Sequence, residues 1–167
     1  MSDLEGFDGL INSLEHLSKE LPGKQLTKTV KEAAGIVQRA IRSAAPEDTG
    51  QLKQGLILHK ERSRTQGKVV YDVLPDPEKN DLFQKPIINP VRSKTPYGYY
   101  PASQEYGFFT RRSDGGMTYT RPDGESVTID KVPGKHYMRT GAEVAGEAAK
   151  AAIAKGVWDI VAKEVAD

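Results

Sequence analysis

Helical spacing of apolar residues occurs at both ends of this 167-residue chain and is lost across its middle. Apolar residues three and four positions apart share one face of an α-helix, so a run of such spacings predicts a helix that buries that face. Two stripes of this kind precede residue 45: Phe7, Leu10, Ile11, Leu14, Leu17 and Leu21, then Leu26, Val30, Ala33, Ala34, Val37, Ile41 and Ala44. We predict that residues 1–45 are helical, with a break at Pro22-Gly23.

A third stripe predicts a C-terminal helix over residues 137–165. Charges of opposite sign stand three or four residues apart at Glu147 and Lys150, at Lys155 and Asp159, and at Asp159 and Lys163, which is typical of an exposed helix face. The apolar positions of this helix are Met138, Ala142, Ala145, Ala149, Ala152, Ile153, Val157, Ile160, Val161 and Val165.

The segment between these helices favours strands and loops. Apolar residues around Leu52–Leu58 and Val69–Leu74 flank a polar, charged stretch, which predicts a β-hairpin over residues 51–74 with a charged tip. Six of the ten prolines lie between Pro75 and Pro101, and we predict an extended loop over residues 75–96.

Further strand signals follow the proline-rich stretch. We predict a strand over residues 97–107 and then a projecting hairpin arm over residues 108–133, with turns at Asp114–Gly116 and Arg121–Gly124. Together these elements predict an α+β fold, with long N-terminal and C-terminal helices packed on a small antiparallel sheet. The length suits a single domain over residues 1–167.

Composition excludes several classes of protein. A net charge of +1 is too small for a general nucleic-acid binder or for a protein drawn to anionic membranes. The chain has no cysteine, which excludes disulfides, thiolate catalysis and zinc–thiolate sites. No apolar stretch approaches the roughly 20 residues that span a bilayer, and the first residues do not resemble a signal peptide.

No motif for catalysis or for cofactor binding is present. His16, His59 and His136 have no metal-binding spacing, no serine lies in G-x-S-x-G, and no glycine-rich loop precedes Lys-Ser or Lys-Thr. We therefore expect no enzyme, no cofactor and no metal site. Glu105 stands out among carboxylates because tyrosines surround it in sequence, and a hydrogen-bonded or interface acid is the favoured reading.

The aromatic residues between Tyr97 and Phe109 cluster beside the proline-rich stretch rather than along a periodic element. Tyrosine and phenylalanine are enriched at interface cores, so an interface competes here with an ordinary core. The candidate interface residues are Tyr97, Tyr99, Tyr100, Phe108, Phe109, Arg111 and Arg112. Basic groups at Lys60–Lys68 and around Arg111, Arg112 and Arg121 leave weak, sequence-independent DNA contact as an alternative.

Three short motifs resemble those of the lambdoid-phage tail-component family. The junction Ala44–Leu52 is similar to the family's A-x-P-x-x-T-G-x-L, through Pro46, Thr49, Gly50 and Leu52. Glu105-Tyr106-Gly107 is similar to its E-[FY]-G, and Tyr137-Met138-Arg139 to the [FY]-[ML]-R at the start of its last helix. The likeness extends from about Phe7 to Val165 in the order of these features.

The resemblance implies a structural virion protein of a tailed bacteriophage. It implies a tail-completion or neck subunit that forms a homo-oligomeric ring, expected to be hexameric, between the head-completion or connector proteins and the tail-terminator or tail-tube proteins. Its place would be the virion neck or tail, with assembly in the host cytoplasm. A tail-terminator ring proper and, more remotely, a DNA-contacting accessory protein remain alternatives.

Arg139 lies in the first turn of the predicted C-terminal helix, where a cation opposes the helix dipole. This unfavourable position indicates a carboxylate partner, and we hypothesise that the partner is Glu105.

Overall fold

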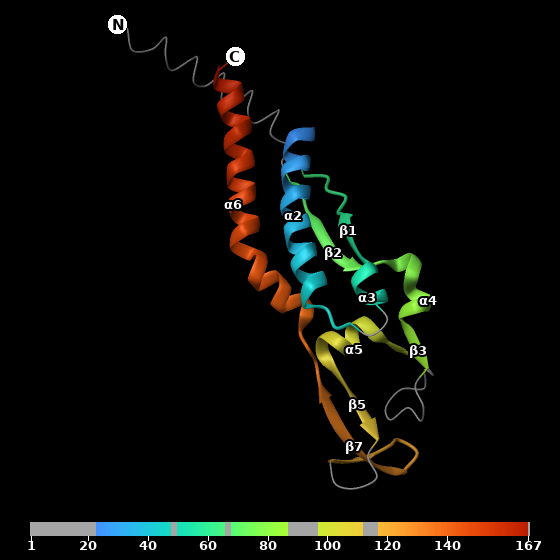
Figure 1. The fold of residues 1–167 in the computed structure, drawn as a ribbon. Coiled ribbons are helices and arrows are strands. Elements are labelled where there is room, and N and C mark those ends of the chain that lie inside the picture. Colours follow the sequence, from blue (N-terminus) through green and yellow to red (C-terminus); the bar gives the residue numbers. More distant parts are fainter. Residues whose placement is uncertain (1–22, 48–49, 66–67, 87–96, 112–116, 167) are drawn as a thin grey trace, which may run out of the picture. The chain divides into compact units, whose positions relative to one another are not determined.

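The computed structural model describes residues 23–47, 50–65, 68–86, 97–111 and 117–166. It has the predicted α+β class, with two long helices and small antiparallel sheets (Figure 1). The long helices are α2 (Lys24–Ala44) and α6 (Tyr137–Ala166), which confirms the second and third predicted helices. The helix predicted over Phe7–Leu21 lies outside the described residues.

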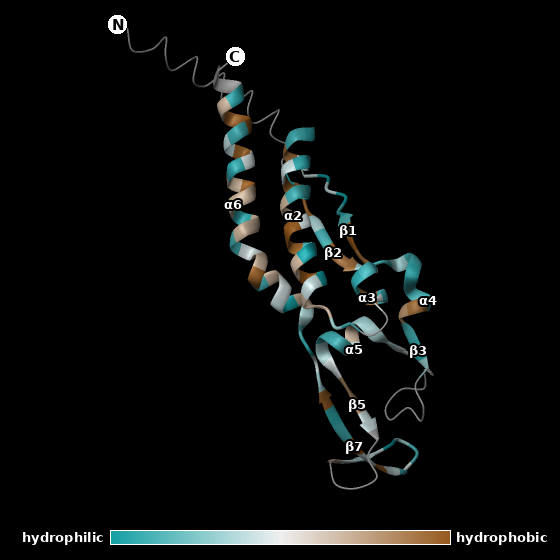
Figure 2. Cartoon of the chain, in the orientation of Figure 1, coloured by the Kyte–Doolittle hydropathy of each residue, from teal (hydrophilic) through white to brown (hydrophobic). Residues whose placement is uncertain are grey.

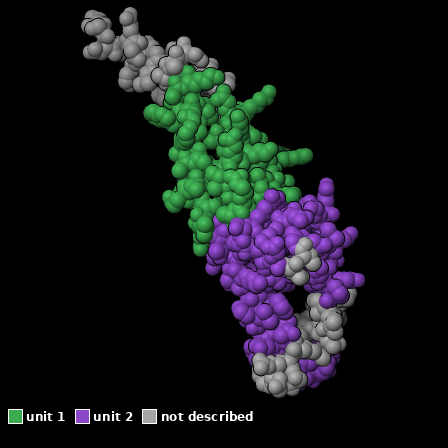
Figure 3. Space-filling model, in the orientation of Figure 1, with its two compact units in different colours: residues 1–40, 57–74, 142–167 green, residues 41–56, 75–141 purple. Residues whose placement is uncertain are grey.

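The chain forms two compact units, each assembled from separate stretches of sequence (Figure 3). The first unit holds residues 1–40, 57–74 and 142–167, and the second holds residues 41–56 and 75–141. Neither unit corresponds to one continuous part of the chain. The single domain over residues 1–167 stays a prediction.

In the first unit, α2 and α6 lie side by side and run in opposite directions (Figure 1). The helices approach closely at Gly156, where an added Cβ would come within 2.4 Å of the Cγ2 of Thr29. Ala33 of α2 is buried at 2% exposure. Small residues at the contact therefore allow the helices to pack tightly.

The predicted hairpin is present, although it begins later than expected. Strands β1 (Leu56–Lys60) and β2 (Tyr71–Pro75) pair with each other, and the Glu61 amide donates to the Val70 carbonyl at 3.1 Å. The described polar residues between the strands, 61–65 and 68, are exposed.

Residues 51–54 form a short helix, α3 (Gln51–Gln54), where we predicted strand. Gly50 adopts φ 74°, a left-handed conformation that suits glycine and turns the chain after α2. The Gly55 amide then closes one helical turn on the Gln51 carbonyl at 2.8 Å. Leu52 and Leu56 are four residues apart and both buried, a spacing that fits a helical turn as well as a strand.

The extended loop predicted over residues 75–96 is wrong for its first half. The described part contains η1 (Pro77–Lys79), α4 (Asn80–Phe83) and β3 (Gln84–Pro86). The Asp76 carboxylate accepts from the Glu78 amide at 3.0 Å, and Pro77 supplies a preset φ at the first helical position. Asp76-Pro77 is thus a helix-start signal. It was missed because the many prolines of this segment favour a loop. Residues 87–96 lie outside the described residues.

The strand predicted over residues 97–107 is wrong for residues 100–106, which are helical. β4 (Tyr97–Tyr99) pairs antiparallel with β3, and α5 (Tyr100–Tyr106) follows. Pro101 stands in the first turn of α5, where its missing N–H costs nothing, and Gly107 ends the helix at φ 83°. Proline and glycine therefore bound a helix in this segment.

The hairpin arm predicted over residues 108–133 is a three-stranded antiparallel sheet. Its strands β5 (Gly107–Arg111), β6 (Met117–Thr120) and β7 (Ser126–Pro133) have the order β5-β7-β6. The turn predicted at Arg121–Gly124 is confirmed, because the Gly124 amide donates to the Arg121 carbonyl at 2.9 Å. The turn predicted at Asp114–Gly116 lies outside the described residues.

Two of the three opposite-charge spacings along α6 form ion pairs. Lys150 contacts Glu147 at 2.8 Å and Lys155 contacts Asp159 at 2.7 Å. Asp159 makes no ion pair within 4.0 Å with Lys163, and both residues are described. Within the described ranges, no helix has the length and hydropathy needed to cross a bilayer.

Gly55 and Phe83 form a tight contact in the second unit. Phe83 is 1% exposed, and a Cβ added at Gly55 would come within 2.3 Å of the Cζ of Phe83. The Gly55 carbonyl also accepts from the Asp76 amide at 2.7 Å, which holds the backbone in place. The sequence between α3 and α4 therefore requires glycine at residue 55.

We predict that Gly55→Ala lowers the free energy of unfolding by about 1–3 kcal/mol, because the methyl group overpacks against the Phe83 ring. Phe83→Leu in the same chain should recover part of this loss, and a double-mutant cycle from denaturant unfolding measures the coupling. Gly146→Ala is the control, since no atom lies within 4 Å of its added Cβ. It should raise stability by about 0.5–1 kcal/mol, and additive effects at residues 55 and 83 would contradict the contact.

Candidate interface site at the start of the last helix

Glu105 is buried at 6% exposure, the one charged residue that is buried among the described residues. It lies in the last turn of α5, followed by Tyr106 and Gly107. The structure agrees with the favoured reading of Glu105 as a hydrogen-bonded acid. A buried carboxylate requires hydrogen-bond donors, because an unpaired charge is costly to remove from water.

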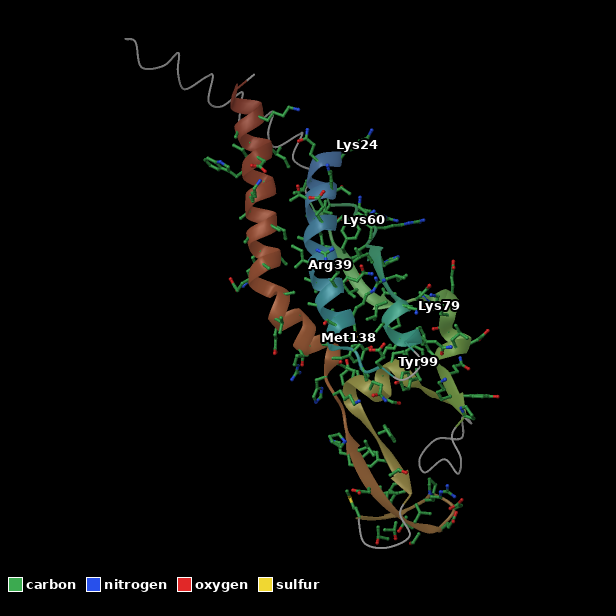
Figure 4. The ribbon with its side chains drawn as sticks, in the orientation of Figure 1. Lys24, Arg39, Lys60, Lys79, Tyr99 and Met138 are labelled. Atoms are coloured by element: carbon green, nitrogen blue, oxygen red, sulfur yellow. The ribbon has the colours of Figure 1, made fainter. Side chains whose placement is uncertain are left out.

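The donors come from the backbone of α6. The Met138 amide donates to Oε2 of Glu105 at 2.8 Å, and the Arg139 amide approaches Oε1 at 3.4 Å. Figure 4 marks Met138 in this first turn of α6. The first amides of a helix have no partner within the helix and carry the positive end of its dipole. Glu105 therefore acts as a side-chain cap for α6, supplied by another helix.

The hypothesis that Glu105 pairs with the Arg139 side chain is wrong. Arg139 is exposed, and no ion pair within 4.0 Å joins it to Glu105. The amides at a helix start point along the helix axis, whereas its side chains point outward. Both carboxylate oxygens face these amides, so the backbone satisfies the acid and the guanidinium stays in solvent.

Backbone hydrogen bonds fasten the same two segments together. The Lys135 amide donates to the Gln104 carbonyl at 2.7 Å, and the His136 amide donates to the Glu105 carbonyl at 3.2 Å. We call residues 104–107 and 133–139, with these bonds and the Glu105 cap, the α5–α6 clasp. The clasp joins the end of α5 to the start of α6, two segments that are more than 25 residues apart in sequence.

Two glycines make the clasp possible. A Cβ at Gly107 would lie 2.3 Å from the Val132 carbonyl oxygen, and a Cβ at Gly134 would lie 2.1 Å from the Glu105 carbonyl oxygen. Both clashes are with backbone atoms that cannot move aside easily. The glycine of Glu-Tyr-Gly was noted in the sequence, whereas Gly134 was not, although its place between Pro133 and Lys135 was a turn signal.

Tyr137 is a clasp residue whose large side chain is buried in the core. It is 1% exposed, and its hydroxyl is buried with no hydrogen-bond partner in the described part of the chain. Burial raises the pKa of this hydroxyl far above its usual range, and the negative charge of Glu105 raises it further. Tyr137 therefore remains neutral and acts as a large packing group.

The candidate interface aromatics remain accessible in the second unit. The exposed fractions are 55% for Tyr97, 37% for Tyr99, 43% for Phe108 and 36% for Phe109. Tyr100 is half-buried, and the neighbouring Tyr106 is the most exposed of the run at 73%. Arg112 lies outside the described residues, and of Arg111 only its place in β5 is described.

Tyr99, one of these aromatic residues, packs against the buried ring of Phe83. The rings of Tyr99 and Phe83 meet edge to face, with centroids 6.1 Å apart and an interplanar angle of 89°. The Tyr99 hydroxyl donates to Oδ1 of Asn80 at 3.4 Å, and partial burial raises its pKa. Tyr99, labelled in Figure 4, is therefore held in one orientation while part of its ring stays in solvent.

The junction motif ends α2 as predicted. The Ala45 amide donates to the Ile41 carbonyl at 2.9 Å, and Pro46 follows. The guanidinium of Arg42 donates to the Leu56 carbonyl at 2.6 Å, a contact that the sequence did not indicate. Lys53 contacts Glu47 at 2.7 Å and lowers the pKa of that carboxyl. Thr49 lies outside the described residues.

The remaining candidates stay separate. No group of three or more potential metal ligands occurs among the described residues. His59 and His136 are both exposed, and His16 lies outside the described part. At the hairpin tip, Lys60 donates to the Thr27 hydroxyl at 3.3 Å, and the other basic side chains, Arg62, Arg64 and Lys68, are exposed.

We predict that Glu105→Ala lowers the free energy of unfolding by about 2–3 kcal/mol, because two buried amides lose their acceptor. Glu105→Gln retains one acceptor oxygen without charge and should cost less. Chemical denaturation measures both, with Glu143→Ala on the exposed side of α6 as a control that changes stability by less than about 0.5 kcal/mol. A loss at residue 105 no larger than in the control would refute the capping role.

Tyr137→Phe should leave stability unchanged or raise it by up to about 1 kcal/mol, because it removes a buried hydroxyl that has no partner. Tyr137→Ala, by contrast, should cost about 3–5 kcal/mol through the cavity it leaves. Thermal unfolding compares the two. A clear loss with phenylalanine would mean that the hydroxyl does have an acceptor.

One family model matches the chain, over residues 8–101, and its description is "Bacteriophage HK97-gp10, putative tail-component". The match includes the junction motif and ends before Glu105, so the later two motifs lie beyond it. No curated protein and no solved structure matches the chain.

The match covers more than half of the chain and contains the Pro46–Leu52 junction, which is the first of the three motifs that resemble the family. The chain therefore belongs to the HK97-gp10-like family of bacteriophage tail components.

Proposed function

We propose that the protein is a tail-completion subunit that forms a ring at the head–tail junction of the virion. Membership of a phage tail-component family supports a structural tail protein, and the exposed aromatic residues of the second unit support a role in assembly. A subunit that works alone rarely leaves several large aromatics in solvent.

The exposed aromatics are the observation that carries the ring proposal. Tyr106, at 73% exposure, and Phe108, at 43%, flank the backbone of Gly107 in the clasp. Aromatic side chains on a rigid backbone lose little conformational entropy on binding, which makes them suitable interface anchors. In a closed ring this surface would contact a different surface of the next copy. The expected ring is a hexamer between connector and tail-terminator or tail-tube proteins.

We predict that Tyr106→Arg with Phe108→Arg reduces oligomer formation and virion incorporation at least about tenfold, since central aromatic anchors each contribute about 2 kcal/mol or more. Sedimentation of the purified subunit and quantitative labelling of virions measure the two effects. Both side chains are exposed, so the unfolding midpoint should hardly change. Thr118→Arg, an exposed position on β6 outside the aromatic set, is the matched control.

The location of the subunit provides the second test. Electron microscopy of virions that carry a labelled copy should show density in a collar at the head–tail junction. A ring at the tail end of that junction would instead favour the tail-terminator alternative. Absence from intact particles, or normal assembly of the double arginine variant, would contradict the proposal.

The DNA-contacting alternative rests on the basic hairpin tip, where Lys60, Arg62, Arg64 and Lys68 are all exposed. Retention of the isolated subunit on DNA at moderate salt would favour it, because contacts to phosphates weaken steeply as salt rises. An enzymatic role is tested by alanine at His16, His59 and His136 together, which should leave assembly intact.

A further inference from the structure

Two stretches of the first unit, residues 24–32 and 60–68, concentrate positive charge. They contain seven of the chain's 24 lysine and arginine residues but two of its 23 acidic residues, Glu32 and Glu61. Their net charge is +5, so the other residues together carry −4, and the overall charge of +1 conceals the difference. A small net charge excludes a chain that is basic throughout, whereas it leaves room for one strongly basic surface.

Three of the basic residues form a line along α2. Lys24, Lys28 and Lys31 are separated by four and then three residues, which places them on one side of the helix. All three are exposed, and among the described residues only Lys28 has an ion-pair partner, an exposed contact of 4.0 Å with Glu32. A pair this long and this exposed stabilises little, so the line remains open to another anion.

The hairpin tip adjoins this line (Figure 1). Lys60, at the end of β1, donates to the Thr27 hydroxyl at 3.3 Å, and Thr27 is three residues after Lys24 and four before Lys31. Residues at these separations are neighbours on a helix surface. Figure 4 labels Lys24 and Lys60. We give the name basic surface to the three lysines of α2 together with the exposed basic residues of the tip, Lys60, Arg62, Arg64 and Lys68.

The basic surface has no apolar anchor. Among the described parts of α2 and the hairpin, no large apolar side chain is exposed. The exposed neighbours are instead Gln25, Ser63 and Thr65, and Figure 2 shows hydrophilic residues at the N-terminal end of α2 and at the adjoining end of the hairpin. A protein interface has a largely apolar core, whereas phosphate contacts come from lysine, arginine, hydroxyl and amide side chains. The surface therefore favours phosphates over an acidic protein.

We propose that the basic surface binds the phosphate backbone of a nucleic-acid duplex, whatever its base sequence. A duplex fits better than a single strand, because the described surface exposes no tyrosine, phenylalanine or tryptophan on which unpaired bases could stack. A net charge of +5 suits about five phosphate contacts, which correspond to a slope of about −4.5 for the logarithm of the binding constant against that of the salt concentration. This site goes beyond the proposed ring, and it shares no residue with the exposed aromatics.

The other side of α2 supplies a matched control. Thr27 contacts the hairpin and Thr29 contacts Gly156 of α6, and residues two apart lie about 200° apart around a helix. Helix α6 therefore packs on the side of α2 that faces away from the tip. Its Lys150 and Lys155 are exposed, and each is paired with an acid of α6.

Fluorescence anisotropy of a labelled DNA duplex, titrated with the isolated full-length subunit, tests the proposal. Binding should be clear at about 50 mM salt and largely lost by about 200 mM. Arg62→Ala with Arg64→Ala should weaken it at least about tenfold at the lower salt and reduce the steepness of the salt slope by about 2, because two phosphate contacts are removed.

Variants of α2 and α6 show whether both elements of the basic surface take part. Lys24→Ala with Lys31→Ala should weaken binding and reduce the slope as the hairpin variant does. Lys150→Ala with Lys155→Ala removes the same charge from α6 and should change affinity by less than about twofold. An α2 variant that behaves like this control would contradict a surface built from both elements.

Competitors identify the ligand. An unlabelled duplex of unrelated sequence and inorganic polyphosphate should both displace the labelled DNA, because phosphates are the common feature. Duplex DNA and duplex RNA share this backbone chemistry, and the ratio of their affinities shows which of them the surface fits. Displacement by polyglutamate as effective as by a duplex of equal charge would assign the surface to an acidic protein and overturn the proposal.

Absence of binding at low salt would also overturn it, as would equal losses in the hairpin variant and the α6 control. The ring is tested separately, because Arg62→Ala with Arg64→Ala should leave oligomer formation and the unfolding midpoint unchanged. DNA binding by a subunit that is absent from virions would support this site and contradict the ring. An oligomeric virion subunit that binds no duplex would do the reverse.

Discussion

The capping of α6 by Glu105 is the interaction on which the second unit depends. The carboxylate is buried, so its charge is tolerated only while the amides of Met138 and Arg139 face it. Those amides in turn lack helical partners and are positioned by the backbone bonds from residues 135 and 136 to α5. Glu105 supplies the acceptor that the first amides of α6 lack, and those amides supply the donors that the buried carboxylate requires. The cap and the backbone bonds are therefore expected to form and to break together.

This dependence explains why the exposed aromatics occupy defined positions. Tyr106 and Phe108 stand on either side of Gly107, whose backbone is in van der Waals contact with the chain around Val132 and Gly134. Side chains attached to such a backbone have little freedom beyond their own torsions. A binding surface built in this way loses less entropy on association than one on a mobile loop. The same motif that fixes the helix start therefore prepares the surface that we propose for assembly.

The long helices and the α+β class were predictable from the sequence because apolar spacing reports directly on helix faces. The short elements were not. Residues 51–54, 77–83 and 100–106 are helical for only one or two turns, too few for a period to show, and local signals such as Asp76-Pro77 and Pro101 decide them. Glu105 was expected to be a hydrogen-bonded or interface acid, but its partner was misjudged. Side-chain charge drew attention to Arg139, whereas the donors were backbone amides, which every residue but proline possesses and no sequence pattern displays.

The glycines of α6 show which side of this helix contacts α2. At Gly141 an added Cβ would come within 2.4 Å of the Ile41 backbone, and at Gly156 it would clash with Thr29, so both positions are settled by contacts already made with α2. At Gly146 an added Cβ would meet no atom within 4 Å beyond the adjacent turns of its own helix. The α2 contact thus accounts for one side of α6 alone, and the alanines at residues 148, 151 and 162 cannot be explained by it, because they are exposed. Alanine has the highest helix propensity of the amino acids, so exposed alanines at these positions stabilise α6 without a packing partner.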